Sequence, residues 1–110
     1  MRLIRHSLVK RDLMALVDHI VEATQRDLDA TVRRLDEIDI LLAEITANPL
    51  SGVRLPTPLE GWLVRHGGRG HRITIVFRAD VNRDALYVAL IAFGGRDWLT
   101  QGNARKSFAG

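Results

Sequence analysis

The residues of this chain whose types and spacing could do chemistry gather in one short segment, His66–Arg72. Two histidines, His66 and His71, bracket the turn Gly67-Gly68-Arg69-Gly70. Because histidine titrates near neutral pH, a histidine beside arginines could act as a general acid or base next to a bound anion. Histidines at the end of a hairpin are also often exposed side chains without a chemical role. Both interpretations stay open at this point.

Two other kinds of chemistry fit this segment poorly. Two histidines without a neighbouring carboxylate or cysteine are an incomplete ligand set for zinc, so we expect no metal site. The glycine-rich turn resembles a phosphate-binding loop only in composition, because it lacks the Gly-x-x-x-x-Gly-Lys-Ser/Thr pattern and opens no helix. We therefore interpret Gly67–Gly70 as a hairpin turn and expect no cofactor.

The composition indicates one domain with a basic C-terminal half. The 110 residues suffice to bury a core, and the absence of cysteine excludes disulfides and favours a cytoplasmic protein. Residues 1–48 hold seven Lys or Arg against nine Asp or Glu, a net −2, whereas residues 49–110 hold nine against four, a net +5. Fourteen of the sixteen basic residues are Arg, which suits bidentate contacts with phosphate or carboxylate, although a GC-rich genome would give the same bias. The longest uncharged apolar run, Leu86–Gly95, is too short to cross a membrane.

The elements that must position these residues follow from the hydrophobic pattern. Two β-rich runs, Arg72–Arg78 and Leu86–Phe93, flank a polar loop and predict a hairpin. In the first run Ile73, Ile75 and Phe77 share one face, so we expect that face to be buried and the other to be partly wet. The second run is apolar on both faces, which predicts a central strand covered on both sides.

The first half of the chain supplies a helical layer for this sheet. A short edge strand, Arg2–His6, is expected before a helix from Leu8 to about Ala23–Gln25, and a second helix is expected to end at Asn48, before Pro49. The second helix carries two seven-residue series: Leu28, Leu35, Leu42 and Thr31, Ile38, Ile45. We favour an αα-hairpin packed within the chain over an intermolecular coiled coil, because only about three heptads are present.

The remaining segments complete an α+β domain. We interpret Leu50–Pro58 as an irregular crossing loop, Leu59–Arg65 as a strand and Arg96–Gly110 as a polar tail. Trp62 and Trp98 are interpreted as core or docking aromatics. The prediction is an N-terminal strand and an αα-hairpin packed on a mostly antiparallel sheet, with one domain over residues 1–98 and a C-terminal tail over residues 99–110.

Four short motifs stand at characteristic places in this element order: Asp12-Leu13, Asn48–Gly52, Gly70–Phe77 and Phe93–Asp97. In this order and spacing, residues 3–98 resemble the RelE/ParE superfamily of toxins from type II toxin–antitoxin systems, which includes plasmid stabilisation proteins. The resemblance implies a small basic toxin that a cognate antitoxin wraps and neutralises. RelE-like members cut mRNA in the ribosomal A site, and ParE-like members poison DNA gyrase.

The resemblance to the RelE-like nucleases implies a catalytic set of Arg65, Arg72 and Arg96 that stabilises phosphate charge. His71 or His66, which stand close to these arginines in the sequence, could substitute as the proton-transfer group. Two groups expected in that set are replaced, a lysine by Leu63 and a tyrosine by Gly102. The proton-transfer groups of the usual nuclease are therefore missing.

We accordingly favour the ParE-like activity, in which the chain performs no chemistry and binds gyrase. The expected contact is the basic side of the sheet together with the tail, through the target-binding residues Arg96, Trp98, Arg105 and Lys106. The alternatives are the ribosome-dependent mRNA endoribonuclease and a non-toxic relative that only binds its antitoxin. An acidic, partly disordered antitoxin segment would suit the basic half in all three cases.

Overall fold

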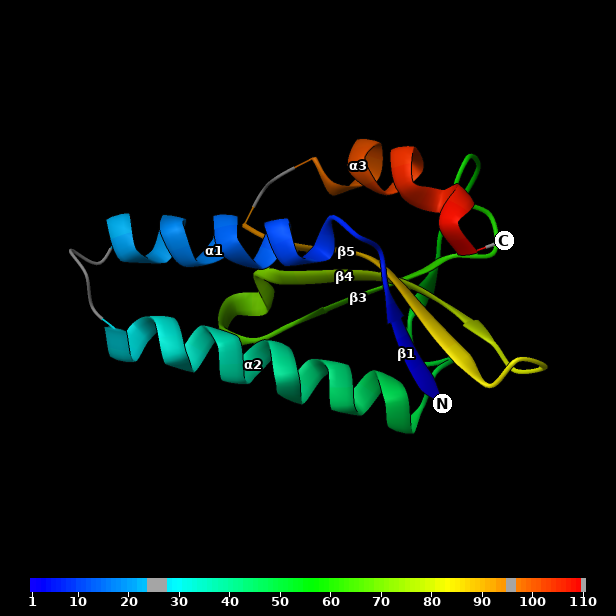
Figure 1. Cartoon of the computed structure of the whole chain (residues 1–110), viewed down its shortest axis with the longest axis horizontal. Coiled ribbons are helices and arrows are strands. Elements are labelled where there is room, and N and C mark those ends of the chain that lie inside the picture. The colour runs from blue at the N-terminus through cyan, green and yellow to red at the C-terminus, as the bar shows by residue number, and fades with distance from the viewer. Residues whose placement is uncertain (24–27, 95–96, 110) are drawn as a thin grey trace.

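The chain folds as an α+β domain in which a sheet separates two layers of helix and loop (Figure 1). The structure, a computed structural model, describes residues 1–23, 28–94 and 97–109. The predicted class, an N-terminal strand and an αα-hairpin on a mostly antiparallel sheet, is confirmed. The elements are β1 (Arg2–Arg5), α1 (Val9–Ala23), α2 (Leu28–Ala47), β2 (Val53–Arg54), β3 (Leu63–Gly67), the 3₁₀ turn η1 (Arg69–His71), β4 (Ile73–Asp80), β5 (Ala85–Phe93), α3 (Trp98–Arg105) and the 3₁₀ turn η2 (Lys106–Ala109).

The sheet has the strand order β1-β5-β4-β3-β2. The predicted hairpin is β4–β5, in which Ile73 lies opposite Phe93 and Asp80 opposite Ala85. β1 is an edge strand, as expected, and it runs parallel to β5, with Arg2 opposite Ala85. The first strand of the chain therefore pairs with the last, and β5 is central, as its apolar residues on both faces predict.

A bulge in β5 changes which of its residues face the helices. Val76 lies opposite Leu90, whereas Phe77 lies opposite Val88, so within the described sheet Ala89 has no partner on β4. Such an extra residue shifts the alternation of side chains along a strand. Val88 and Ile91 consequently face the same core, although simple alternation would separate them.

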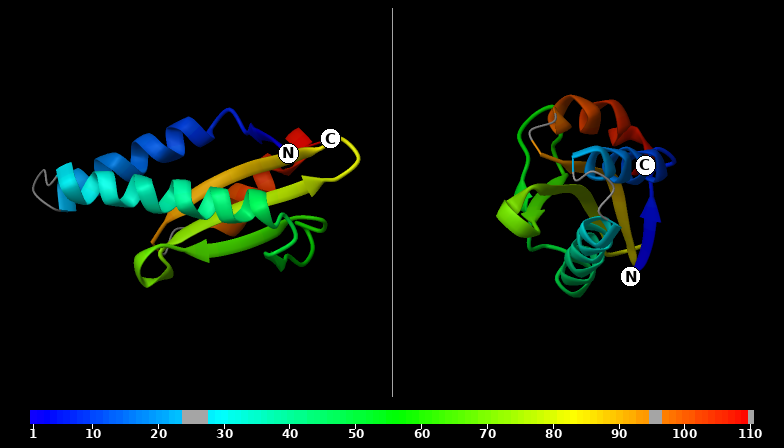
Figure 2. Two further views of the ribbon diagram at one scale, coloured as in Figure 1. Left: turned by 90° about the horizontal axis from the view of Figure 1, so that it is seen from below. Right: turned by 90° about the vertical axis from the view of Figure 1, so that its left-hand side faces the viewer.

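The α1–α2 layer covers one face of the sheet, as Figure 2 shows from below and from the end of the hairpin. α1 contributes Val9, Leu16 and Ile20 at helical spacing, and α2 contributes Ile38 and Ile45. These side chains are almost completely buried against the sheet residues Ile73, Ile75, Phe77, Leu86 and Val88. The predicted packing of the helices within the chain is confirmed, but Leu28 of the heptad series is 69% exposed.

The other face of the run Arg72–Arg78 is partly wet, as expected, because Arg72 and Arg78 are exposed, but its middle is dry. Thr74 and Val76 are 3% and 0% exposed. A second core covers them, built on Leu59 and Trp62 with Trp98 packed against it. Leu59 and Trp62 were expected in a strand, but they belong to the segment that precedes β3; Val53–Arg54, expected as loop, is paired with β3 as β2.

The C-terminal segment is part of the folded domain and not a separate polar tail. Asp97 caps α3, because its carboxylate accepts hydrogen bonds from the Thr100 backbone N–H (3.2 Å) and hydroxyl (2.7 Å). Gly102 is buried, and a Cβ there would already lie 3.5 Å from Leu59, so a small residue lets α3 approach the sheet closely. None of the helices in the described ranges is long and apolar enough to cross a bilayer.

Candidate functional site

Arg65, the first of the predicted catalytic arginines, ties β3 to the end of α2. Its Nη2 donates to Glu44 Oε2 at 2.7 Å, and its Nη1 donates to Ser51 Oγ at 3.2 Å. The side chain is 28% exposed. Arg65 lies opposite Ile75, and Ile75 is three residues after Arg72 in the chain. The backbone positions of Arg65 and Arg72 are therefore about 10 Å apart along the strand direction.

Arg72 and His71 lie at the turn that joins β3 to β4, and both are exposed. Arg72 lines a cavity of about 350 Å³ with Arg34 of α2, Arg69, Gly70 and Phe93. We call this the arginine cavity. Sequence analysis did not identify Arg34, because a single charged residue in a helix carries no signal of what the fold brings opposite it.

The arginine cavity has a net positive charge. Glu37 forms an ion pair with Arg34 one turn along α2. Burial raises the pKa of Glu37, but the hydrogen bonds from Arg34 and from the backbone of Arg69, together with the charges of both residues, outweigh it and leave the pKa below its usual value. Glu37 is therefore ionised at neutral pH and offsets only one of the three guanidinium charges. The arrangement suits an anion such as phosphate.

The second histidine, His66, lies on the other face of β3 and has structural contacts. Its Nδ1 lies 2.9 Å from Thr74 Oγ1, and its ring stands edge-on to Trp98 with the centroids 5.8 Å apart. The structure thus brings Arg72 together with Arg34 and Arg69 and not with Arg65 or His66. Arg96 lies outside the described residues.

The predicted target-binding residues fall into different environments. Trp98 is half-buried against the second core, and Lys106 is exposed, with its Nζ donating to Pro58 O at 3.0 Å. Arg105 is only 9% exposed, so the prediction that it contacts a target is wrong for this fold. Its guanidinium instead forms a bidentate ion pair with Asp12, Nη1 to Oδ2 at 2.6 Å and Nη2 to Oδ1 at 2.9 Å.

This ion pair lies on the bulge of β5. Arg105 Nη1 also donates to Ala89 O at 3.0 Å, and Asp12 Oδ2 accepts from Ile91 N at 3.2 Å. The sequence analysis used Asp12 only as part of the Asp12-Leu13 motif. Its spacing from Val9 and Leu16, three and four residues away, was the signal that could have placed it on the buried face.

A second cavity, of about 450 Å³, adjoins this ion pair where β5 continues past its last pairing with β1. It is lined by Asp12, Leu16 and His19 of α1, by Gln101 of α3 and by the end of β5, and His19 packs against Phe93 with ring centroids 5.9 Å apart. Among residues 1–23, 28–94 and 97–109, no three His, Cys, Asp or Glu side chains lie close enough together to hold a metal ion.

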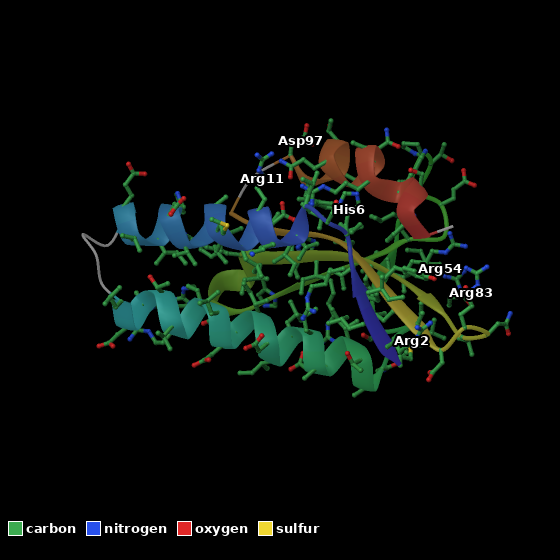
Figure 3. All side chains as sticks on the ribbon, viewed as in Figure 1. Arg2, His6, Arg11, Arg54, Arg83 and Asp97 are labelled. Atoms are coloured by element: carbon green, nitrogen blue, oxygen red, sulfur yellow. The ribbon has the colours of Figure 1, made fainter. Side chains whose placement is uncertain are left out.

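A core covers the middle of each face of the sheet, so the expected basic side is reduced to the arginines that these cores leave exposed, such as Arg78 of β4. Other arginines lie at the two ends of the β4–β5 hairpin. Arg69 and Arg72 lie at one end, and Arg2, Arg54 and Arg83 lie at the end that carries the β4–β5 turn (Figure 3). Comparison with protein-family models, with curated proteins and with solved structures finds no match to this chain.

Proposed function

We propose that this protein is the toxin of a type II toxin–antitoxin module of the RelE/ParE kind, acting in the cytoplasm by binding DNA gyrase, as ParE-like members do, and neutralised by a cognate antitoxin. The observation that carries the choice of target is the position of Arg65. Glu44 and Ser51 hold its guanidinium at the end of α2, whereas Arg72 lines the arginine cavity. Arg65 and Arg72, two of the cations that the resemblance assigns to a nuclease, thus have different surroundings, which supports a function without phosphate chemistry.

Two further features support this proposal. The element order β1, α1, α2 and then the antiparallel strands is the order on which the resemblance rests. The α1–α2 hairpin is also long, since the 20 residues of α2 span about 30 Å, and it projects past the end of the sheet (Figure 1). A projecting hairpin and an exposed Lys106 offer surface for binding a large partner without any chemistry.

The decisive experiment is controlled expression of the chain in a bacterium without the antitoxin, with DNA and protein synthesis followed by pulse labelling. Gyrase poisoning stops DNA synthesis first and induces a DNA-damage response. Purified protein should then inhibit supercoiling by gyrase in vitro, and Lys106→Ala should weaken that inhibition more than Arg83→Ala, which removes an exposed positive charge from the turn between β4 and β5. Protein synthesis that fails first would overturn the proposal.

The second candidate is the ribosome-dependent endoribonuclease, and the arginine cavity favours it. Arg34, Arg69 and Arg72 could hold a phosphate, with His71 next to Arg72 as the group that moves a proton. Under this alternative, Arg72→Ala abolishes codon-phased mRNA cleavage and keeps antitoxin binding, whereas Arg83→Ala, at the other end of the hairpin, changes neither. A chain that binds its antitoxin and slows neither synthesis would be the non-toxic relative.

A further inference from the structure

An apolar groove runs between α1 and α2 on the exposed side of the hairpin. It encloses about 360 Å³ and is lined by Leu13, Met14 and Val17 of α1 and Leu35 of α2, with Lys10 and Asp18 at its margins. We call these six residues the hairpin groove. Met14 is 59% exposed, and the groove is continued along α2 by Leu28 and Val32, which stand seven and three residues before Leu35 and are 69% and 55% exposed. Exposed apolar side chains that form one contiguous patch often mark a site of interaction, whereas single exposed apolar residues are ordinary.

The charges of the hairpin groove form a self-complementary pattern. Lys10, Met14 and Asp18 follow one another at four-residue spacing and make a single ridge on α1. Lys10 and Asp18 are about 12 Å apart along the helix, too far to pair with each other. Within the part of the chain that the structure describes, neither of them has an ion-pair partner.

We propose that the hairpin groove is the interface of a symmetric homodimer in which the α1 helices of two copies pack antiparallel, with Met14 of each copy at the two-fold axis. In this arrangement Lys10 lies opposite the partner subunit's Asp18, and Asp18 lies opposite the partner subunit's Lys10. The symmetric packing of the two helices thus forms both ion pairs and buries Met14 and its apolar neighbours. An unrelated partner would need no such symmetry about Met14, and this is why the occupant is a second copy.

The dimer leaves the candidate functional site open. Arg34 and Leu35 are consecutive in α2 and so stand about 100° apart around its axis, which puts the arginine cavity on another side of the helix from the groove. Asp12 and His19, which line the cavity at the end of β5, lie on a different side of α1 from Met14. Figure 2 shows the two helices side by side, with α3 on the far side of the sheet from α2. The inference goes beyond the proposed function and does not depend on it.

The test is the molar mass of the full chain in solution, measured by sedimentation equilibrium over a range of concentrations. The native chain should dimerise, and Met14→Glu should be monomeric because it places two carboxylates at the axis. Lys10→Asp and Asp18→Lys should each weaken the dimer at least about tenfold, since each creates two like-charge contacts. The double variant Lys10→Asp with Asp18→Lys should restore most of the lost affinity, because it exchanges the two charges and keeps them complementary.

Arg33→Asp is the control, since it makes the same change of charge at an exposed position of α2 that lies about 160° around the helix axis from Leu35, and it should leave the dimer intact. The substituted residues of the groove are exposed, and circular dichroism verifies that each variant keeps the fold. A native chain that is monomeric at all concentrations would overturn the proposal. So would a dimer that tolerates Lys10→Asp, or a double variant that is weaker than both single variants.

Discussion

The ion pair of Asp12 and Arg105 shows, at the scale of single residues, how a bulge can be accommodated in a buried strand. An extra residue breaks the ladder and leaves backbone groups that must find other partners. Here Arg105 donates to Ala89 O and Asp12 accepts from Ile91 N. The side chains of Asp12 and Arg105 are 9% and 10% exposed, so water solvates neither charge well. Each charge is stabilised instead by the other.

Removing one member of this pair should be costly. Asp12→Ala leaves a buried guanidinium without its carboxylate and the Ile91 N–H without an acceptor, and we expect a loss of about 3–5 kcal/mol in the free energy of unfolding. Urea denaturation measures this loss. Adding Arg105→Met to Asp12→Ala should cost less than the sum of the single changes, because neither charge then stays buried alone. Additive losses would show that the two side chains act independently.

His6, at the junction of β1 and α1, titrates under the influence of the same pair (Figure 3). Burial lowers the pKa of His6 below 6.5, the charge of Arg105 lowers it further, and Asp12 opposes both. The unfolded chain therefore takes up this proton at a higher pH than the folded chain. The contribution of His6 to stability is complete above pH 6.5 and is lost as the pH falls through the folded pKa.

The prediction for His6 is that the free energy of unfolding falls below pH 6.5 and that His6→Asn flattens this fall. Asparagine does not titrate in this range, and it keeps an acceptor for the Leu8 N–H, which now donates to His6 Nδ1 at 3.1 Å. Thermal melts of both proteins at a series of pH values measure the difference. Equal slopes would assign the pH dependence to other groups.

At the scale of elements, α3 covers the second face of the sheet, and the pattern of the sequence could not show this. Its residues are polar on average, and Gly102 stands in its middle, where glycine usually weakens a helix. A Cβ at this position would be in ordinary van der Waals contact with Leu59 and Val76, so a small residue fits the packing of α3 here. The β4–β5 hairpin was predictable because its alternation and its turn are local, whereas β2 has only two residues and no periodicity to detect.

Deletion of residues 98–110 should therefore unfold the domain and would not be a clean test of a binding tail. Without α3, the second core loses Trp98, and Asp12 loses its ion-pair partner Arg105. We expect loss of the cooperative denaturation transition. Deletion of residues 106–110 is the matched control, because it keeps Arg105 and α3. A stable, cooperative 1–97 fragment would contradict this account of α3.

The turn before β4 depends on Gly68. Its φ of 73° suits glycine, and a Cβ there would lie 2.7 Å from Ile73 Cδ1 and 2.9 Å from Glu37 Oε2. We expect Gly68→Ala to destabilise the fold and to disturb the arginine cavity beside it. Gly94→Ala is the control, since Gly94 has the same φ and a Cβ there has nothing within 4 Å. The control should cost about 1–2 kcal/mol of backbone strain alone, and Gly68→Ala should cost more.

At the scale of the whole molecule, the candidate site is made by contacts between distant parts of the chain. The arginine cavity joins α2 to the turn before β4, and the ion pair on the bulge joins residues 93 positions apart. Sequence analysis identified Arg72 and His71 as candidates but could not foresee that Arg34 would join them or that Glu44 would hold Arg65 away. The half-to-half charge asymmetry of the sequence does not become one basic face, because the two cores cover the middle of the sheet and several arginines lie at the two ends of the β4–β5 hairpin.

The pairing of β1 with β5 has a consequence for synthesis on the ribosome. Arg2 of β1 lies opposite Ala85, and Asp12 of α1 forms its ion pair with Arg105. The N-terminal strand and helix therefore emerge from the ribosome long before the residues that they contact. The nascent chain can form its helices early, but β1 can join the sheet only when β5 has left the exit tunnel. The surface around Asp12 and Arg105 forms later still, so a partner that binds this surface cannot bind a nascent chain in which Arg105 is still inside the ribosome.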